Sequence, residues 1–264
     1  MFDTPTYFAF LALVLVPPLV ALAVLARRRL TRTFVAGTAL VTAIGFVYTV
    51  PWDNALIARG VWWYGDDAVL ATLYRAPLEE YLFILLQPLL TALWLVVLRE
   101  RLSGARPGGD AYEAERSWVA VSTRARIGGA VAGLLVGASG LVFLTGERTL
   151  YLGAILAWAG PVLALQWGFG WQELVRTRRL TALAVLVPTV YLSVADRVAI
   201  ELGIWVLSPR FTTGVTVAGL PVEEGLFFLV TNVFVVQGLV LFLWVVERPE
   251  PVDESVPDAT PASP

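Results

Sequence analysis

The sequence of 264 residues contains no cysteine, no histidine and no lysine, and all 19 of its basic residues are arginine. Without cysteine the chain has no disulfide, iron–sulfur cluster or thiol nucleophile. Without histidine it lacks the imidazole acid–base group and the commonest zinc and haem ligand. Without lysine no retinal Schiff base forms, which excludes a rhodopsin. Proton chemistry therefore falls to aspartate, glutamate, tyrosine or arginine.

Charge is scarce as well. Only 15% of the residues are charged, 58% are hydrophobic, and the mean hydropathy is +0.73. A soluble domain carries about a quarter charged residues, so an ordinary soluble enzyme is excluded and a chain embedded in lipid is indicated. A spanning helix needs about 20 apolar residues. Seven segments qualify or come close: Thr6–Ala26, Thr33–Pro51, Leu78–Leu98, Ile127–Leu144, Leu150–Gly170, Leu180–Ala195 and Val222–Val246.

The arginines are distributed unequally between the two sides of these segments. Most lie on the side that holds Arg27–Arg29, the stretch 99–126 and Arg176–Arg179. The other side holds Arg59, Arg75, Arg148, Arg197 and Arg210. Because cytoplasmic loops carry the excess of basic residues, we expect an integral protein of the cell membrane with its N-terminus outside and its C-terminus in the cytoplasm.

The sequence repeats itself. A nearly constant offset pairs spans one to three with spans five to seven, and the fourth span joins the two repeats. The paired residues are Tyr7 and Tyr151, Tyr48 and Tyr191, Asp53 and Asp196, Trp62 and Trp205, Pro77 and Pro221, Glu79 and Glu223, Glu80 and Glu224, and Phe83 and Phe227. Three spans of the first repeat and the joining span together cross the membrane an even number of times. The second repeat therefore begins on the same side as the first, and both repeats have the same orientation. Substrate sites commonly lie between such repeats.

These patterns predict an all-α polytopic membrane protein with seven transmembrane helices. We divide it into a first three-helix repeat (1–98), a cytoplasmic linker with the connecting helix (99–148), a second three-helix repeat (149–246) and a disordered acidic tail (247–264). Short hairpins are expected on the outer side, one formed by Val61–Tyr64 with Ala68–Tyr74 and one by Ile204–Leu207 with Phe211–Val217. A small-residue face at Gly129, Gly133 and Gly137 predicts close packing inside the molecule rather than a dimer interface.

The strongest local signal is a doubled Pro-x-Glu-Glu motif, Pro77–Glu80 and Pro221–Glu224, at the start of two spans. Proline and carboxylates both suit a first helical turn, so simple capping is one interpretation. Capping does not require a glutamate pair at the membrane boundary, where ionisable groups are costly and are functional candidates. Four glutamates that meet in a low-dielectric site share protons. We therefore expect Glu79, Glu80, Glu223 and Glu224 to supply a protonated acid and an ionised base.

Other residues extend this candidate site. Gln87 follows Glu80, and Thr231 follows Glu224, by seven positions on one helical face, and Asn232 lies beside Thr231. Because their partners seven positions later are polar, we expect Glu80 and Glu224 to be the glutamates that face the site. The stripes predict either a shared cavity or an interhelical hydrogen-bond seam without one. Two interpretations also remain for Asp53 and Asp196, which either orient the glutamates and relay protons or pair with nearby arginines. The aromatic side chains near the same boundary, Trp52, Trp62, Trp63, Tyr64, Tyr74 and Trp205, form an interfacial belt or stabilise a carbocation.

At these motifs the sequence resembles the membrane-integral lycopene cyclases of archaea, actinobacteria and fungi, in which two related halves occur separately or fused in one chain. The segments that carry the resemblance are Pro77–Phe83, Pro221–Phe228, Gly60–Tyr64 and Gly203–Trp205. It extends over about Thr6 to Val246. This chain resembles the fused form without an appended phytoene synthase domain.

The resemblance implies a redox-neutral cyclisation of the linear ends of lycopene to ionone rings, giving β-carotene through γ-carotene. The catalytic candidates are Glu79, Glu80, Glu223, Glu224, Asp53 and Asp196; the substrate-binding candidates are Trp62, Tyr64, Trp205, Phe83, Phe227, Gln87, Thr231 and Asn232. No metal, flavin or nicotinamide is expected. The expected partners are membrane lipid and a linear carotenoid, with no nucleic acid, and a homo-oligomer is compatible with the sequence.

Several alternatives and details remain open at this point. A cyclase of C50 carotenoids fits the same motifs. A membrane isoprenoid transferase would need aspartate-rich diphosphate sites, which Asp66-Asp67 alone does not provide. A proton or ion carrier would need polar residues across the whole membrane, yet spans one, four and five are almost wholly apolar. The ring type, the number of ends cyclised, the glutamate that acts as the acid and the oligomeric state are not fixed by the sequence.

Overall fold

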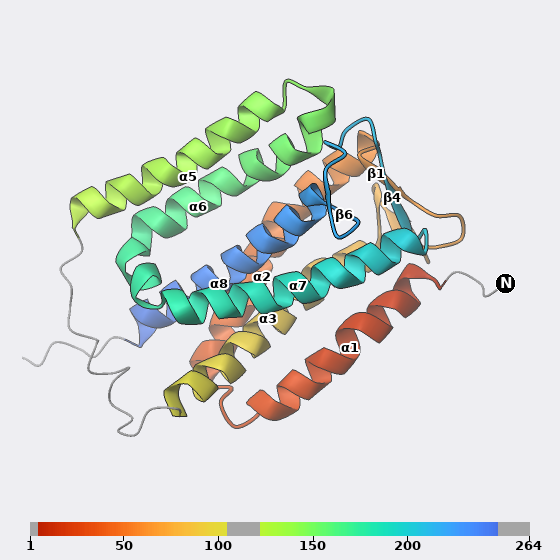
Figure 1. The fold of residues 1–264 in the computed structure, drawn as a ribbon. Helices are drawn as coiled ribbons and strands as arrows, with labels where there is room; N and C mark the ends of the chain where they lie inside the picture. The colour runs from red at the N-terminus through yellow and green to blue at the C-terminus, as the bar shows by residue number, and fades with distance from the viewer. Residues whose placement is uncertain (1–4, 105–121, 248–264) are drawn as a thin grey trace, which may run out of the picture.

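The computed structural model describes residues 5–104 and 122–247, and this part of the chain forms a bundle with seven helices long and apolar enough to cross a membrane (Figure 1). The helices are α1 (Tyr7–Ala26), α2 (Arg32–Ala58), α3 (Leu78–Gly104), α5 (Thr123–Phe143), α6 (Leu150–Arg176), α7 (Arg178–Glu201) and α8 (Val222–Val246), with a short 3-10 helix η1 (Glu147–Thr149) before α6. The predicted polytopic all-α fold is confirmed. The predicted tail beyond Glu247 and most of the predicted linker lie outside the described residues.

Several helices are longer than hydropathy indicated. α2 continues through Pro51 to Ala58, and α7 continues past Asp196 and Arg197 to Glu201. The charged pair in α7 is accommodated because the two side chains have separate environments. Asp196 is buried inside the bundle, whereas Arg197 is exposed and binds Glu201 one turn later at 2.6 Å. A segment chosen by hydropathy ends at such charged residues, whereas the backbone hydrogen bonds of the helix continue past them.

Six short strands lie at one end of the bundle, which we call the strand end. They are β1 (Trp62–Tyr64), β2 (Thr72–Leu73), β3 (Ala76–Pro77), β4 (Trp205–Leu207), β5 (Thr216–Val217) and β6 (Leu220–Pro221). Two small hairpins are present, β2 with β3 and β5 with β6. The expected partners of the aromatic strands were wrong, because β1 pairs with β4 of the other repeat and not within its own loop (Figure 1). Each strand thus satisfies the other's backbone groups.

The β1–β4 pair shows how the two repeats are related. Trp62 lies opposite Leu207, and Tyr64 lies opposite Trp205. In the repeat, Trp205 is the equivalent of Trp62 and Leu207 is the equivalent of Tyr64, so exchanging the two repeats leaves the pairing unchanged. The flanking hydrogen bonds follow the same rule: Gly65 N–H donates to Ile204 C=O at 3.0 Å, and Ser208 N–H donates to Val61 C=O at 2.8 Å. A self-complementary register of this kind is the signature of a two-fold relationship. A pseudo-two-fold axis therefore passes through this strand pair.

The centre of the bundle is formed by α3 and α8, which pack against each other, and each also packs against α2 and α7. α5 lies outside this core and packs along α6 (Figure 1). Their backbones are in close contact through glycines: a Cβ atom added to Gly133 would collide with the backbone of Ala164, and one added to Gly137 would lie 3.2 Å from Gly160 Cα. The predicted role of this glycine face in internal packing is confirmed.

Candidate active site

The two copies of Pro-x-Glu-Glu begin α3 and α8 in the same way. The N–H of the first helical residue donates to a loop carbonyl, from Leu78 to Ala71 at 2.9 Å and from Val222 to Val215 at 3.0 Å. The first glutamate of each pair then holds the preceding loop. Glu79 Oε1 accepts the N–H of Leu70 at 2.8 Å, and Glu223 Oε1 accepts that of Thr213 at 2.7 Å.

Glu79 and Glu223 are completely buried against these loops and do not line the cavity described next. The expectation that four glutamates meet therefore holds for only two of them. The reason is geometric, since neighbouring helical residues point about 100° apart. One member of each pair faces its loop and the other faces the bundle interior.

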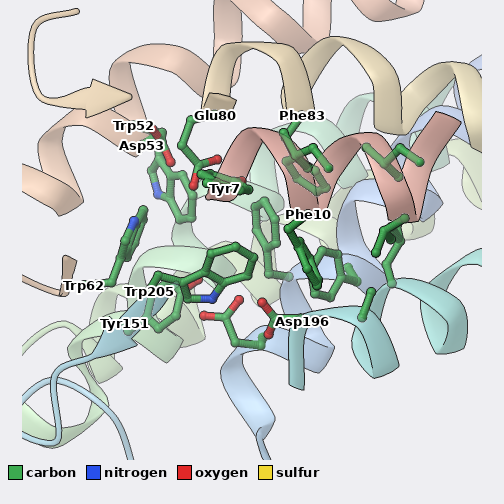
Figure 2. Close-up of a pocket in the computed structure, with 18 residues that line it drawn as sticks. Tyr7, Phe10, Trp52, Asp53, Trp62, Glu80, Phe83, Tyr151, Asp196 and Trp205 are labelled. Carbon is green, nitrogen blue, oxygen red and sulfur yellow. The ribbon is translucent and has the colours of Figure 1, made fainter. Parts of the chain in front are cut away.

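Glu80 and Glu224 both face one cavity of about 70 Å³ near the strand end, and Asp53 from α2 and Asp196 from α7 line it as well. Figure 2 shows the carboxylates of Asp53 and Glu80 on one side and that of Asp196 on the other, with aromatic rings between them. The structure thus brings both predicted acidic pairs to one place. Each repeat contributes one glutamate and one aspartate, as the two-fold relationship requires.

Tyrosine hydroxyls contact the two glutamates unequally. Tyr64 donates to Glu80 Oε1 at 2.7 Å and accepts the indole N–H of Trp62 at 3.1 Å. Tyr7 also interacts with Glu80, and its repeat counterpart Tyr151 interacts with Glu224. Burial and the neighbouring Glu80 charge raise the pKa of Tyr64 well above its ordinary value. Its hydroxyl therefore stays protonated and able to donate at neutral pH.

The two aspartates are not partners of the nearby arginines. Asp53 and Asp196 are 6% and 3% exposed, and each has a side-chain oxygen without a hydrogen-bond partner. Arginines near the site pair with other carboxylates: Arg197 with Glu201 and Arg210 with Glu147, each at 2.6 Å. Of the two interpretations left open by the sequence, the position of these aspartates beside the glutamates favours orientation and proton relay.

A scan against protein-family models shows where this arrangement belongs. The model described as lycopene cyclase matches residues 4–98 and 148–243, which contain the two three-helix repeats. The chain belongs to the lycopene cyclase family. It is 51% identical over 248 residues to a lycopene beta-cyclase of Halobacterium salinarum, with 93% of this chain and 99% of that protein covered.

More distant relatives of this lycopene cyclase family member are longer proteins. It is 37% identical over 233 residues to a bifunctional lycopene cyclase/phytoene synthase of Leptosphaeria maculans, with 86% of this chain and 39% of that protein covered. A protein of the same description from Arthroderma gypseum is 34% identical over 233 residues. No solved structure matches the chain.

Within this family member, the predicted polar stripes form a seam and not a cavity wall. Gln87 Nε2 donates to Asn232 Oδ1 at 2.7 Å, the Thr91 hydroxyl donates to the same atom at 2.5 Å, and Asn232 Nδ2 donates to Thr189 at 3.1 Å. Thr231 bonds back to carbonyls of its own helix. Gln87, Thr231 and Asn232 do not line the carboxylate cavity, and of the two arrangements that the stripes predicted the structure shows the hydrogen-bond seam.

Most of the aromatic side chains noted in the sequence lie at the cavity, but Trp63 and Tyr74 are exposed and do not line it. Trp62, Trp205, Phe83 and Phe227 line the cavity, and Tyr64 reaches it through Glu80. Trp52 lines the cavity as well, and further lining rings that the sequence reasoning did not assign to the site are Tyr7, Phe10, Tyr151 and Phe228 (Figure 2). The Tyr7 and Trp205 rings lie 4.9 Å apart, and those of Trp52 and Phe227 lie 5.9 Å apart. Tyr7 and Tyr151 could have been predicted as site residues, because they occupy matching positions in the two repeats.

Proposed function

We propose that this chain is a lycopene cyclase that closes the linear ends of lycopene to β-ionone rings. The observation that carries the proposal is the cavity itself, in which two glutamates and two aspartates are surrounded by aromatic and aliphatic side chains inside a membrane-spanning bundle. The Halobacterium salinarum relative, named a lycopene beta-cyclase, supports the same substrate and product. A hydrocarbon substrate dissolves in lipid, which accounts for an enzyme embedded in the membrane.

The reaction is an isomerisation in which a carboxylic acid supplies the first proton. That proton adds to the terminal double bond of lycopene and leaves a tertiary carbocation. The neighbouring double bond attacks the cation, so that a new carbon–carbon bond closes a six-membered ring and the charge moves to a ring carbon. A carboxylate removes one ring proton and a new double bond forms. Atoms and electrons balance, so the chemistry requires no flavin, nicotinamide or metal.

The contacts favour different roles for the two glutamates. The Tyr64 hydroxyl donates to Glu80, and Leu207, which has no hydroxyl, stands at the equivalent position of the second repeat. Hydrogen bonds to a charged acceptor are the stronger ones, so the environment of Glu80 suits a carboxylate better. We assign Glu224 as the acid that starts the reaction and Glu80 as the base that ends it. Asp53 and Asp196, beside the two glutamates, return the proton from base to acid after each ring closure.

The aromatic rings protect and stabilise the carbocation. Electron-rich ring faces attract a cation within about 6 Å, and rings line this cavity from both repeats. Trp205 contacts Tyr7 and Phe10 of α1 and lines the cavity together with Asp196 and Glu224. A cavity walled by such rings also excludes water, which would otherwise capture the cation as an alcohol.

We further propose that the site lies near the outer face of the cell membrane. The strand end carries Arg59, Arg75, Arg148, Arg197 and Arg210, whereas the opposite ends of the described helices carry Arg27–Arg29, Arg32, Arg99, Arg101, Arg124, Arg126 and Arg176–Arg179. The positive-inside rule then puts the arginine-rich end in the cytoplasm. In this orientation the N-terminus is outside and the C-terminus is in the cytoplasm.

Single-turnover cyclisation in heavy water tests this proposal. Purified protein in molar excess is equilibrated in D₂O and mixed anaerobically with lycopene, without added cofactor. We expect a cyclic product that carries one deuterium in the first ring formed, because the initiating proton comes from a carboxyl group that has exchanged with the solvent. A cyclic product without deuterium, or conversion only after a flavin or nicotinamide is added, would contradict the mechanism.

A further inference from the structure

The walls of the carboxylate cavity do not follow the pseudo-two-fold axis, although the carboxylates do. Within the described part of the chain, α6 reaches the cavity with Tyr151 alone, whereas its counterpart α1 lines the cavity over about two turns. α7 contributes Leu192 and Ala195 beside Asp196. The lining residues of α1 are Tyr7, Phe10, Leu11, Val14 and Leu15. The cavity therefore extends further toward α1 and α7 than toward α2 and α6.

Two differences between the repeats account for this asymmetry. By the offset of the repeat, Trp158 in α6 corresponds to Val14 in α1, and Trp52 in α2 corresponds in the same way to Ala195 in α7. The Trp52 and Trp158 rings stack with their centroids 4.8 Å apart, and the Trp52 indole N–H donates to the Ala154 carbonyl of α6 at 3.3 Å. Two indoles thus fill the space between α2 and α6. Valine and alanine leave the equivalent space between α1 and α7 to the cavity.

A tyrosine hydroxyl joins the helices at each of these two places. Tyr48 of α2 donates to the Trp158 carbonyl of α6 at 2.8 Å. Its counterpart Tyr191 of α7 donates to the Val14 carbonyl of α1 at 2.6 Å. That carbonyl is free to accept because Pro18, one turn later, has no N–H to donate. Tyr191 is 39% exposed, so α1 and α7 meet at the outer surface of the bundle, directly beside the space that belongs to the cavity.

The two helices that carry these carbonyls are also held differently. α6 packs along α8 and is covered by α5 on its outer side, whereas α1 packs mainly on α3 and lies at the edge of the bundle (Figure 1). α5 belongs to the connection between the repeats and therefore covers only one of the two equivalent helices. Parting α1 from α7 breaks fewer contacts than parting α6 from α2.

We propose that the linear carotenoid enters the carboxylate cavity sideways from the membrane, between α1 and α7, and that its polyene chain leaves the bundle there while one end reacts. This inference rests on the proposed cyclase function. A cavity of about 70 Å³ does not hold a whole carotenoid, so most of the molecule extends out of it. Val14 and Ala195 line the cavity and are themselves only half-buried, which places the opening between them. Trp52 and Trp158 close the equivalent route between α2 and α6.

The test closes the open side with the two side chains that close the other one. Val14→Trp/Ala195→Trp is compared with Leu13→Trp/Val190→Trp, a matched control on the same two helices at positions that are 74% and 61% exposed. Ala195→Leu is a smaller enlargement of the same wall and serves if the double variant folds poorly. All are made in the active chain and in the inactive Glu80→Gln chain.

Two readouts separate this inference from the proposed function. In the active background, we expect Val14→Trp/Ala195→Trp to lower lycopene conversion by at least about tenfold, which corresponds to about 1.4 kcal/mol, while the control pair leaves it unchanged. In the Glu80→Gln background, binding is read in phospholipid nanodiscs from visible circular dichroism. Lycopene is achiral and gains such a signal when the protein holds it. We expect the signal to fall by a similar factor in the closed variant only.

Each other outcome has a definite meaning. An equal dichroism signal in the closed and control variants would overturn the inference, whether or not conversion falls, because the substrate would then bind without the opening. Equal losses in both variants would overturn it as well. Absence of conversion by the unmodified chain would instead count against the proposed function, and the dichroism signal would still decide the opening. Absence of both would overturn the two together.

Discussion

The hydroxyl of Tyr64 donates a hydrogen bond to Glu80 Oε1 at 2.7 Å, and this contact has no equivalent in the second repeat. Leu207 stands at the position that corresponds to Tyr64, directly opposite Trp62 in the β1–β4 pair. Glu80 and Glu224 therefore occupy equivalent positions in the two repeats but have different hydrogen-bond donors around them. An extra donor on one of them is the structural basis for assigning the base and the acid.

Removal of this donor tests its contribution. Hydrogen bonds to charged groups contribute about 1.5–3 kcal/mol, so Tyr64→Phe should slow cyclisation by roughly tenfold to a hundredfold without preventing folding. Tyr74→Phe is a suitable control, because Tyr74 lies in the same loop and is 86% exposed. Initial rates with purified protein provide the measurement. Equal rates for Tyr64→Phe and Tyr74→Phe would show that the Tyr64–Glu80 contact has no part in the reaction.

The four glutamates should divide into two functional classes. Glu80→Gln and Glu224→Gln should abolish cyclisation, since an amide neither donates nor accepts the required proton. Glu79→Gln and Glu223→Gln should remain active, because an amide oxygen still accepts the loop N–H that each carboxylate accepts now. Each variant is quantified in the membrane before its carotenoids are analysed. Active Glu80→Gln and Glu224→Gln proteins would refute the assignment of the site.

Shortening the two cavity glutamates should separate the base from the acid. Glu80→Asp withdraws the proposed base, so a proton is removed from the other adjacent ring carbon or from the methyl group, and the product contains more ε or γ rings beside β rings. Glu224→Asp withdraws the proposed acid, so cyclisation slows while the ring type is unchanged. Product analysis by chromatography distinguishes the two results. The reverse pattern would exchange the two roles.

The helix pair α5–α6 provides a prediction about stability. A Cβ atom at Gly133 would collide with the Ala164 backbone, so Gly133→Ala should destabilise the protein by about 1–3 kcal/mol, the usual cost of overpacking. A Cβ atom at Gly128 of the same helix has no atom within 4 Å, so Gly128→Ala should be neutral or slightly stabilising. Thermal unfolding in one detergent compares them. Equal midpoints would argue against close packing at Gly133.

Much of the site could be predicted because its acidic motifs occur at matching positions in both repeats. One Pro-x-Glu-Glu at a helix start is explained by capping, but its second copy, with Asp53 and Asp196 at matching positions, indicated two elements that converge. Helical periodicity then favoured Glu80 and Glu224 over their neighbours. The same repeat contained Tyr7 and Tyr151, and treating every paired polar residue as a site candidate would have included them.

Other features depend on contacts that local sequence does not encode. The seven-residue spacing of Glu80 and Gln87 identifies a shared face, but not whether that face meets a cavity or another helix. The pairing of β1 with β4 depends on the two-fold arrangement of whole repeats, whereas hairpin rules consider only neighbouring segments.

Expression of the chain in a bacterial host that accumulates lycopene, followed by chromatography of the pigments, tests the central claim most directly. The account predicts that lycopene is converted to monocyclic and bicyclic β-ring carotenes, and that the Glu224→Gln chain leaves lycopene unchanged. Unchanged lycopene in cells whose membranes contain the folded, unmodified chain would contradict the claim that this cavity cyclises lycopene.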